Sequence, residues 1–282
     1  MKTRKKKKHT GRTVFLVLIL VLAFLLIDSN FRVQVTEYDI ESSEIPKSFE
    51  GFRILQLSDL HNREFGEENE ELLGNIKGAK PDIIVVTGDL ADAACEDLEG
   101  FVRPLMEGLT GIAPTFYVSG NHEWAAGFME ELFDLLEDCG VTALRNDYVA
   151  MEKNGERIIL AGCEDPNGPY DMMTPEELVA DIREAYGDSC IIMLNHRNDA
   201  LGRFADLGVA LVLSGHGHGG IIRLPFTDGL IDQNREWLPT YTSGIYVEGE
   251  TQMVVSRGLG WHVAIPRFLN NPHIPVVVLH AS

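Results

Sequence analysis

Basic residues are scarce in most of this chain. Its 282 residues include 24 lysines and arginines against 43 aspartates and glutamates, a formal net charge of −19. Seven of the basic residues fall within residues 1–12, so the remaining chain carries 17 basic and 43 acidic residues, a formal charge of −26. Proteins that bind nucleic acid derive much of their affinity from Lys and Arg side chains that neutralise phosphates. A body this acidic excludes nucleic acid as an expected partner.

Cysteine is also sparse, and no two cysteines are spaced as a CxxC pair. The four cysteines are Cys95, Cys139, Cys163 and Cys190. Four cysteines allow three disulfide connectivities, which the sequence cannot separate. In a domain of this size, buried free thiols are the favoured interpretation, and the three pairings stay open.

A signal-peptidase site is missing after the hydrophobic segment near the N-terminus. Val14–Ile27 is an uninterrupted apolar run that follows the basic start directly. As a helix it spans about 21 Å, and Gly11, Arg12 and Thr13 can extend it toward the roughly 30 Å hydrocarbon core of a bilayer. Since no small-x-small cleavage site follows, we expect an uncleaved signal anchor rather than a cleaved signal peptide.

The distribution of charge around this segment sets the expected topology. By the positive-inside rule, the basic segment 1–12 stays in the cytoplasm and residues 13–30 cross the cell membrane as a single transmembrane helix. Residues 31–50 are expected to form a polar linker with one candidate strand at 32–38. Residues 51–282 then form one extracytoplasmic domain, large enough for a buried core.

From residue 52 onward the hydrophobic pattern alternates between strands and helices. Short continuous apolar runs predict buried strands at 53–57, 82–87, 115–119, 148–153, 157–162, 190–195, 209–213, 241–247, 252–256 and 274–280. Helical stretches are expected at 67–80, 96–109 and 128–139. Strands that alternate with helices indicate an α/β fold.

Several predicted strands end in a side chain that can bind a metal, with a small residue beside it. The segments are Ser58-Asp59-Leu60-His61, Gly88-Asp89, Gly120-Asn121-His122, Leu194-Asn195-His196 and Ser214-Gly215-His216-Gly217-His218. Each segment alone has an ordinary explanation, because a strand-end Asp often caps a helix or forms a turn. In α/β sheets, however, sites form just beyond the carboxyl ends of the strands. The agreement of five segments therefore predicts one shared site.

The residue types in these segments indicate which metals fit. Nitrogen and oxygen ligands are present without a thiolate: Asp59, His61, Asp89, Asn121, His196, His216 and His218. Such a set suits Mn, Fe or Zn better than Ca, which prefers oxygen ligands. Seven ligands are too many for one tetrahedral site. They suit two divalent ions that share a bridging carboxylate, about 3.5–4 Å apart, an arrangement used to hydrolyse phosphate esters.

The order of the motifs resembles the calcineurin-like metallophosphoesterase superfamily. The resemblance rests on Asp59-x-His61, Gly88-Asp89, Gly120-Asn121-His122-Glu123, His196 and Gly215-His216-x-His218. It extends from Phe52 to about Gly220, and the segments 219–225 and 255–260 beyond it look like the small membrane-anchored bacterial branch. The resemblance implies a four-layer α/β/β/α sandwich with a binuclear metal site at one sheet edge.

The resemblance also implies a role for each motif residue. The first metal would be held by Asp59, His61 and His218, the second by Asn121, His196 and His216, with Asp89 as the bridge. His122 is similar to the family's histidine that is not a ligand but contacts the scissile phosphate and protonates the leaving group. The chain departs from the family pattern at Arg197 and Asn198, which follow the fifth-motif histidine, and at Ile221, where many relatives have Gln. Neither departure removes a ligand.

The implied reaction is hydrolysis of a phosphodiester by a hydroxide that bridges the two metals, with His122 as the proton donor. Two further roles are expected less strongly. Arg63 would stabilise charge on the phosphate, and Asp92 would orient a metal ligand. The membrane anchor makes a lipid-linked phosphoester a reasonable substrate. The aromatic residues either line the site's mouth or belong to the core: Trp124, Phe128, Trp237, Tyr241 and Trp261.

Three alternatives remain at this point. A Ser/Thr protein phosphatase shares the metal ligands, but that branch has Asp-Arg-Gly after its Gly-Asp segment, whereas here Leu90, Ala91 and Asp92 follow. A phosphomonoesterase would use the same centre. A non-catalytic, metal-dependent membrane scaffold is disfavoured because every expected ligand is present.

Overall fold

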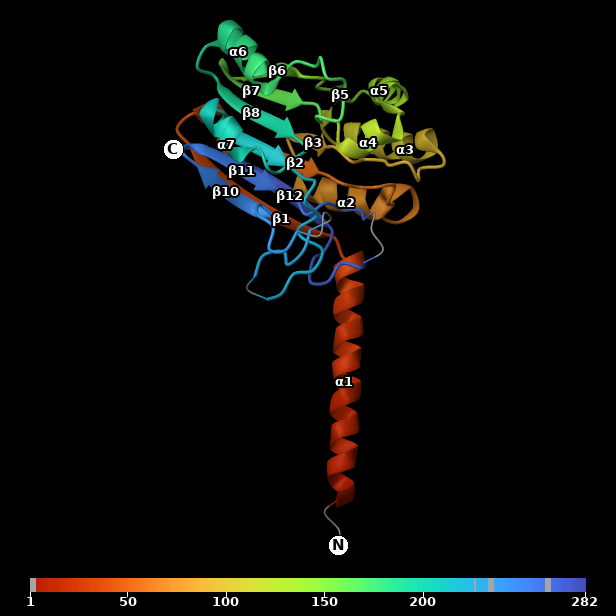
Figure 1. The fold of residues 1–282 in the computed structure, drawn as a ribbon. Helices are drawn as coiled ribbons and strands as arrows, with labels where there is room; N and C mark the ends of the chain where they lie inside the picture. Colours follow the sequence, from red (N-terminus) through yellow and green to blue (C-terminus); the bar gives the residue numbers. More distant parts are fainter. Residues whose placement is uncertain (1–3, 226, 233–235, 262–264) are drawn as a thin grey trace.

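The computed structural model describes residues 4–225, 227–232, 236–261 and 265–282. A long N-terminal helix, α1 (Arg4–Phe31), projects from a compact α/β body (Figure 1). The other helices are α2 (Glu70–Ala79), α3 (Leu98–Thr110), α4 (Asn121–Ala126), α5 (Met129–Asp138), α6 (Pro175–Tyr186) and α7 (Leu201–Asp206), with short 3₁₀ helices η1 (Lys47–Phe49) and η2 (Glu67–Asn69).

The strands of the body form two six-stranded sheets. The first sheet has the order β1 (Gln34–Ser42), β12 (His273–Ala281), β2 (Arg53–Leu57), β3 (Ile83–Thr87), β4 (Thr115–Val118), β5 (Thr142–Ala143). The second has the order β10 (Gly244–Glu248), β11 (Thr251–Val255), β9 (Leu211–Ser214), β8 (Cys190–Asn195), β7 (Glu156–Cys163), β6 (Asp147–Lys153).

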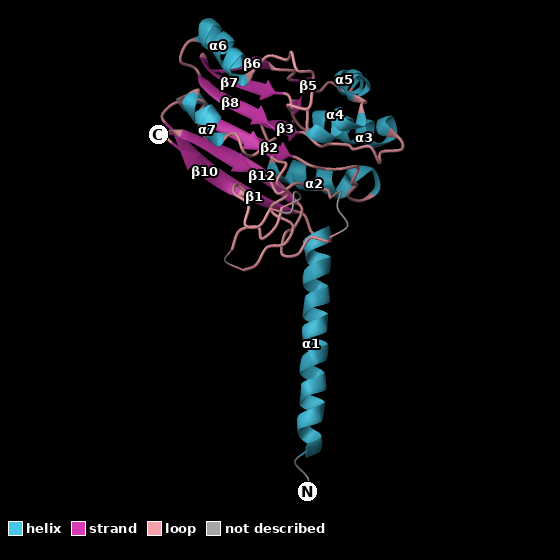
Figure 2. Ribbon diagram, viewed as in Figure 1, coloured by secondary structure: helices cyan, strands magenta, loops and turns pink. Residues whose placement is uncertain are grey.

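The two sheets pack face to face, and helices cover both outer faces (Figure 2). Successive residues of the central strands serve opposite layers. In β3, Ile83 and Val85 pack between the sheets, while Ile84 and Val86 pack against α2, α3 and α5. Strands buried on both faces are continuous apolar runs for this reason. The predicted four-layer α/β/β/α sandwich is confirmed.

Parallel pairing brings the strand ends to one edge. β2, β3 and β4 are parallel neighbours in the first sheet, and β7, β8 and β9 are parallel neighbours in the second. Parallel strands have their carboxyl ends on the same side. The segments that follow these strands therefore meet at one edge of the sandwich, as the motif positions require.

One local expectation is extended by the structure and one helix was missed. The candidate strand at 32–38 is present as the nine-residue strand β1, which runs on to Ser42 and pairs in parallel with β12, so the first sheet begins three residues after α1 ends. The sequence pattern also missed helix α6, although Thr174 and Glu177 form a reciprocal capping box at its start and Pro175 occupies its first turn. The four cysteines are free thiols.

Candidate metal centre

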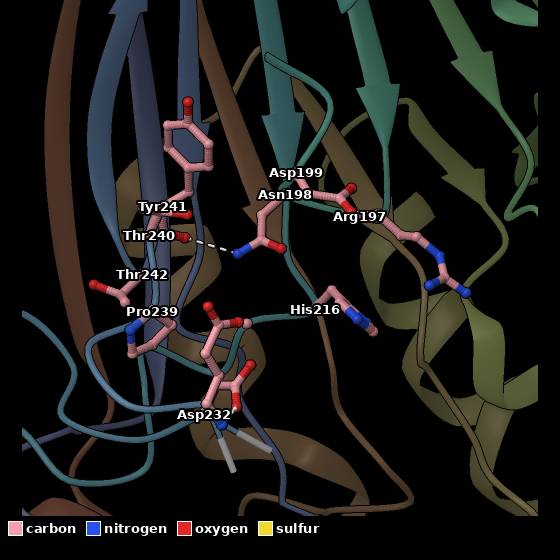
Figure 3. A pocket seen from close by; sticks show the side chains of 11 residues that line it. Arg197, Asn198, Asp199, His216, Asp232, Pro239, Thr240, Tyr241 and Thr242 are labelled. Carbon is pink, nitrogen blue, oxygen red and sulfur yellow. Dashed lines mark hydrogen bonds between the residues drawn. The ribbon is translucent and has the colours of Figure 1, made fainter. Parts of the chain in front are cut away.

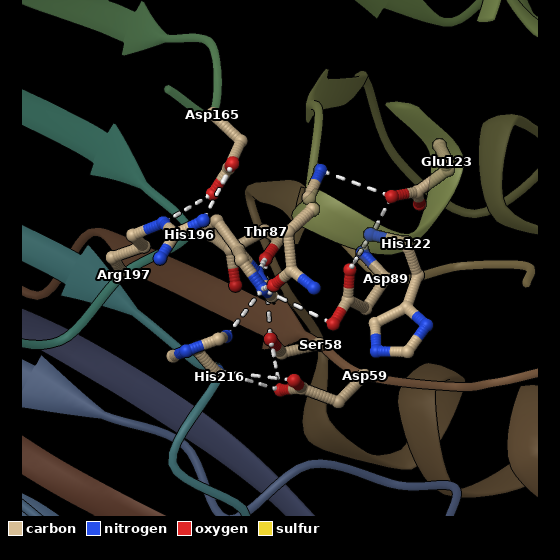
Figure 4. A network of polar contacts seen from close by, with 12 residues as sticks. Ser58, Asp59, Thr87, Asp89, His122, Glu123, Asp165, His196, Arg197 and His216 are labelled. Atoms are coloured by element: carbon tan, nitrogen blue, oxygen red, sulfur yellow. Dashed lines mark hydrogen bonds and ion pairs between the residues drawn. The ribbon is translucent and has the colours of Figure 1, made fainter. Parts of the chain in front are cut away.

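The predicted ligands lie in the turns that leave the parallel strands, and these turns are unusually sharp. Several predicted ligands have positive φ angles, between 47° and 63°: Asp59, His61, Asp89, His216 and His218. Left-handed backbone is sparsely populated by residues with a side chain and is typical of functional sites. Here the turns aim side chains from separate strands at one point (Figure 4).

Glycines beside the ligands allow the loops to approach closely. A Cβ atom on Gly120 would lie 2.2 Å from Oδ1 of Asp89, and one on Gly215 would lie 1.8 Å from Oγ of Ser58. Both distances are shorter than any real contact. The strand-end glycines are therefore a steric requirement of the site.

One group of ligands comes from the ends of β2 and β9. Asp59, His61 and His218 are buried, and each offers a ligand atom within 4.8 Å of the others. Nε2 of His61 lies 3.3 Å from Nε2 of His218, and the latter lies 3.7 Å from Oδ1 of Asp59. Asp59 is held by a hydrogen bond from Ser58 Oγ (2.5 Å) and by the main-chain N–H of His216. The structure thus brings together the three residues predicted to hold the first metal.

A second group surrounds His196. Its Nδ1 lies 2.8 Å from the carbonyl oxygen of Thr87 and must carry a proton to donate there, which leaves Nε2 facing the site. Within 3.2 Å of that Nε2 lie Nδ1 of His216, Oδ1 of Asn121 and Oδ2 of Asp89. Such a convergence of electron-pair donors in a buried pocket fits a cation, so the donor chemistry suits a divalent metal.

Asp89 lies between the two groups. Its Oδ2 is 3.7 Å from Nε2 of His61 and 3.1 Å from Nε2 of His196. Burial alone would raise the pKa of Asp89, but the neighbouring histidines, His196 foremost, lower it well below the usual value. Burial likewise acts to lower the pKa of His196, and Asp89 overcomes it and raises that pKa to about 10. The pocket thus favours positive charge beside an ionised carboxylate.

His122 stands at the side of this centre, at the start of α4. Its main-chain N–H donates to Oδ1 of Asp89 (2.9 Å), and its ring meets the ring of His61 edge to face at 4.7 Å. Burial lowers the pKa of His122. Asp92 approaches His61 from behind, with Oδ2 3.4 Å from Nδ1, which is the position expected of a residue that orients this ligand.

The weaker sequence expectations have different outcomes. Arg63 does not point at the metal centre: its guanidinium donates to the main-chain carbonyls of Asn30 and Leu259. Arg197 and Asn198 line a cavity of about 170 Å³ next to His216 (Figure 3). Arg197 is held there by a two-pronged ion pair with Asp165, at 2.8 and 3.0 Å. Asn198 donates to the carbonyl of Tyr241 at the far wall.

Glu123 has a structural role that the sequence analysis did not assign. Its fully buried carboxylate accepts hydrogen bonds from the main-chain N–H groups of Asp89, Leu90 and Gly120 (Figure 4). It therefore ties the loop after β3 to the loop after β4. The spacing Gly120 to Glu123 at a helix start is a capping signal that could have indicated this contact.

Comparison with known proteins agrees with this centre. The sequence model of calcineurin-like phosphoesterases matches residues 52–220, which include all the predicted ligands and His122. The chain belongs to the calcineurin-like phosphoesterase family. Membership indicates a hydrolase of phosphoric esters with a metal-binding site, and the ligand clusters at the strand ends are consistent with it.

Relatives of this calcineurin-like phosphoesterase extend over nearly its whole length. It is 32% identical to the uncharacterized metallophosphoesterase YkuE of Bacillus subtilis, over 89% of this chain and 86% of that protein. It is 30% identical to a metallophosphoesterase of Aquifex aeolicus, over 93% of this chain and 97% of that protein. A Danio rerio protein named as a transmembrane protein with a metallophosphoesterase domain is 27% identical, over 94% and 61% of the two chains.

Among solved structures, the Thermus thermophilus sulfate thiohydrolase SoxB has a similar fold. Its TM-score is 0.52 at 14% sequence identity, and the match covers 84% of this chain and 58% of that chain. Identity this low supports the shared fold of the phosphoesterase and nothing about its substrate.

Proposed function

We propose that this phosphoesterase hydrolyses phosphodiesters with two divalent metal ions, at the outer face of the cytoplasmic membrane. The observation that carries the proposal is the clustering of metal-binding side chains from five strand ends. Asp59, His61 and His218 form one cluster and Asp89, His196 and His216 another, and His61 also lies in a third with Asp92 and His122. Asp89 lies 3.7 Å from His61 and 3.1 Å from His196. A single tetrahedral ion has four ligand positions, fewer than the seven residues predicted to bind metal.

Each ligand set takes residues from both sheets. Asp59, His61 and His218 would hold one ion, Asn121, His196 and His216 the other, and Asp89 both. Manganese, iron and zinc all accept this mixture of imidazole and oxygen ligands. When bound, such a pair supplies a water of lowered pKa and neutralises charge on the phosphate oxygens. Thr87 and Asp92 fix the ring orientations of His196 and His61.

His122 is suited to deliver the proton that the reaction needs. In the hydrolysis, a water oxygen bonds to phosphorus, one P–O ester bond breaks, and the departing alkoxide takes a proton to become an alcohol. The imidazole of His122 lies 4.7 Å from the ring of His61, its main-chain N–H donates to Asp89, and the family pattern gives it no place in either ligand set. Burial lowers the pKa of His122 and the charge of Asp89 opposes that shift, so the fraction of imidazole that can donate this proton increases as the pH falls.

The surroundings of the centre favour a diester over a protein phosphomonoester. The cavity beside His216 offers space for the second ester group, and it is lined by polar side chains from Arg197 to Thr242. The run after Gly88-Asp89 is Leu90-Ala91-Asp92-Ala93-Ala94, which lacks the arginine of the protein-phosphatase branch. Arg197 is tied to Asp165 at the rim.

The membrane location rests on α1. Its segment Gly11–Phe31 is long and apolar enough to cross a membrane. The basic residues lie on the N-terminal side, and by the positive-inside rule the catalytic domain faces away from the cytoplasm. Digestion of sealed, right-side-out membrane vesicles tests this: an external protease should remove the catalytic domain. Protection of that domain would contradict the topology.

The proposed activity is tested with purified full-length protein and two chromogenic esters. After metal removal and resupply of Mn²⁺, turnover of bis(p-nitrophenyl) phosphate should return and should exceed turnover of p-nitrophenyl phosphate. Preference for the monoester would contradict the diesterase assignment. Bound metal without turnover of either ester would favour the scaffold alternative.

A further inference from the structure

The anchor helix is fixed to the catalytic domain rather than tethered by a flexible linker. The main-chain N–H of Leu269 donates to Oγ of Ser29 (2.8 Å). Asn30 exchanges two hydrogen bonds with the main chain of Arg267, at 2.9 and 3.1 Å. Asn271 donates to the carbonyl of Asp28 (2.7 Å) at the same turn. Side chains from the last turn of α1 thus set the height of the domain above the membrane.

The loops that receive α1 form a continuous layer, which we call the membrane-proximal platform: residues 221–225, 229–232, 236–238 and 265–271. Main-chain pairing joins its parts. Ile222 pairs with Phe268, and Ile231 pairs with Trp237. The N–H of Leu238 donates to the carbonyl of Leu230 (2.9 Å). In Figure 1 these loops lie beside the end of α1, below the sheets.

This platform exposes large apolar side chains. Trp237 is 73% exposed, Leu238 70%, Ile265 49% and Leu224 43%, and Phe31, at the end of α1, is 70% exposed. Soluble surfaces rarely gather apolar side chains of this size, and such a patch marks an interaction surface. Because the patch lies next to a helix that can span a membrane, the lipid bilayer is the partner expected to cover it.

The length of α1 places this surface at the bilayer boundary. Gly11–Phe31 has 21 residues and spans about 31 Å, close to the roughly 30 Å of the hydrocarbon core. The residues that bind the platform, Asp28 to Phe31, therefore lie where hydrocarbon gives way to head groups. Tryptophan is enriched at this level because its ring is apolar and its N–H is polar.

The platform is also connected to the metal centre. Trp261 meets the ring of His218 edge to face at 5.3 Å, and the guanidinium of Arg267 lies 5.1 Å from the centre of the same indole ring. Arg267 donates to the carbonyl of Gly260 (2.7 Å), and the N–H of Gly260 donates to the carbonyl of Asp59 (2.6 Å). The loop that holds a metal ligand is thus braced by the loop that holds the anchor.

The cavity beside His216 borders the same layer. Its wall includes Glu236 and the segment from Pro239 to Thr242, and the exposed Trp237 and Leu238 lie between them in the chain. A phosphate group bound at the centre would therefore have the platform at one side of it. An acyl chain attached to that phosphate could leave along an apolar surface.

We propose that the membrane-proximal platform lies in the head-group layer of the bilayer and presents the metal centre to a phosphodiester of a membrane lipid. The lipid's phosphorus lies at the level of the cavity, while its acyl chains stay in the membrane beside Trp237 and Leu238. The substrate class rests on the proposed phosphodiesterase function; the contact between platform and bilayer does not.

Fluorescence quenching tests the contact with the bilayer. Full-length protein is reconstituted into vesicles of phosphatidylcholine and phosphatidylglycerol that contain brominated acyl chains. We expect tryptophan emission to be quenched, and the substitution Trp237→Phe to remove most of the quenching, since Trp237 is the tryptophan on the exposed surface. Equal quenching in the wild type and in Trp237→Phe, or none in either, would overturn the contact.

Turnover tests the substrate class. The probes are phosphatidyl-p-nitrophenol in the vesicles and soluble bis(p-nitrophenyl) phosphate. In the double variant Trp237→Ser/Leu238→Ser, the ratio of lipid to soluble turnover should fall by about tenfold or more. The control Val247→Ser removes a side chain that is 64% exposed on β10, outside the platform, and should keep the ratio.

The outcomes separate the two proposals. An unchanged ratio in the double variant, or no lipid turnover by a wild type that hydrolyses the soluble ester, would overturn the lipid substrate. Failure to hydrolyse either ester would overturn the proposed phosphodiesterase function and the lipid substrate with it. In that case the quenching experiment would still decide whether the platform contacts the bilayer.

Discussion

The metal centre and the membrane-proximal platform are built in different ways. At the metal centre, each ligand follows a buried strand, and the sheets on both sides fix its position. The platform consists of loops joined by isolated bridges, and it exposes apolar side chains instead of burying them. The two regions therefore have different roles. The strand ends fix the positions of the proposed metal ligands, and the loops of the platform are proposed to contact the membrane in which the substrate lies.

The largest loss of activity is expected when Asp89, the proposed bridging ligand of the two metals, is replaced. Asp89→Asn replaces the carboxylate that lies between the two ligand groups with a neutral amide. We expect turnover of lipid and soluble esters alike to fall by more than about 10⁴-fold, beyond the loss expected for a proton donor alone, together with loss of bound metal. Metal analysis and both assays measure this, and exposed Asp188→Asn is the matched control.

Removal of the proposed proton donor should affect chemistry without affecting metal binding. His122→Ala leaves both ligand sets intact, so metal content should stay at the wild-type level. Turnover of a diester with an alkyl leaving group should fall by about 10²–10⁴-fold. A nitrophenyl ester should lose less, because nitrophenolate leaves without a proton. Equal losses on both esters, or loss of metal, would contradict the role. His280→Ala, at the exposed end of β12, is the control.

Replacement of Asp92, which contacts the predicted ligand His61, should reduce metal affinity by an intermediate amount. Asp92→Asn weakens the contact that orients His61. Substitutions of this kind reduce metal affinity or activity by about 10–100-fold. The loss should appear as a higher Mn²⁺ concentration for half-maximal turnover, with maximal turnover largely restored at saturation. Unchanged Mn²⁺ dependence would exclude Asp92 from this role.

The smallest effect is expected at the junction of α1 and the platform. Asn271→Ala removes the donor to the carbonyl groups of Asp28 and Arg32. These contacts are partly buried, and the carbonyl of Asp28 keeps the N–H of Arg32 as a donor. The free energy of unfolding should therefore fall by about 0.5–1.5 kcal/mol, the net worth of an ordinary hydrogen bond, while metal content stays the same. Asn75→Ala, on the exposed face of α2, should have less effect. Loss of bound metal in Asn271→Ala would contradict this prediction, because it would show that metal binding depends on the contact between α1 and the platform.

The sequence predicted the metal centre better than the platform, for a physical reason. The ligands follow continuous apolar strands, so strand periodicity and the rule for parallel sheet edges were enough to place Asp59, Asp89 and His196 together. Arg63 was misassigned because its position after a motif does not determine where a long side chain points. Its guanidinium donates to the carbonyl groups of Asn30, in the anchor helix, and of Leu259.

The platform has no periodic signal that could be recognised. Its pairing of Ile222 with Phe268 joins residues far apart in the chain, and the residues of the surrounding loops that the structure describes form isolated bridges. Trp237 was expected either to line the mouth or to belong to the core, and its exposure is a property of the folded chain. Glu123 lies in the recognised motif, but its three main-chain contacts depend on the meeting of two loops.

A metal titration of the full-length protein tests the central claim most directly. Metal-free protein is titrated with Mn²⁺ while bound metal and turnover of bis(p-nitrophenyl) phosphate are measured on the same sample. We predict that turnover rises to its maximum as the second ion per chain binds, and that Asp89→Asn reaches neither that occupancy nor that turnover. Full turnover in the metal-free protein, or saturation at a single ion per chain, would contradict a two-metal phosphodiesterase.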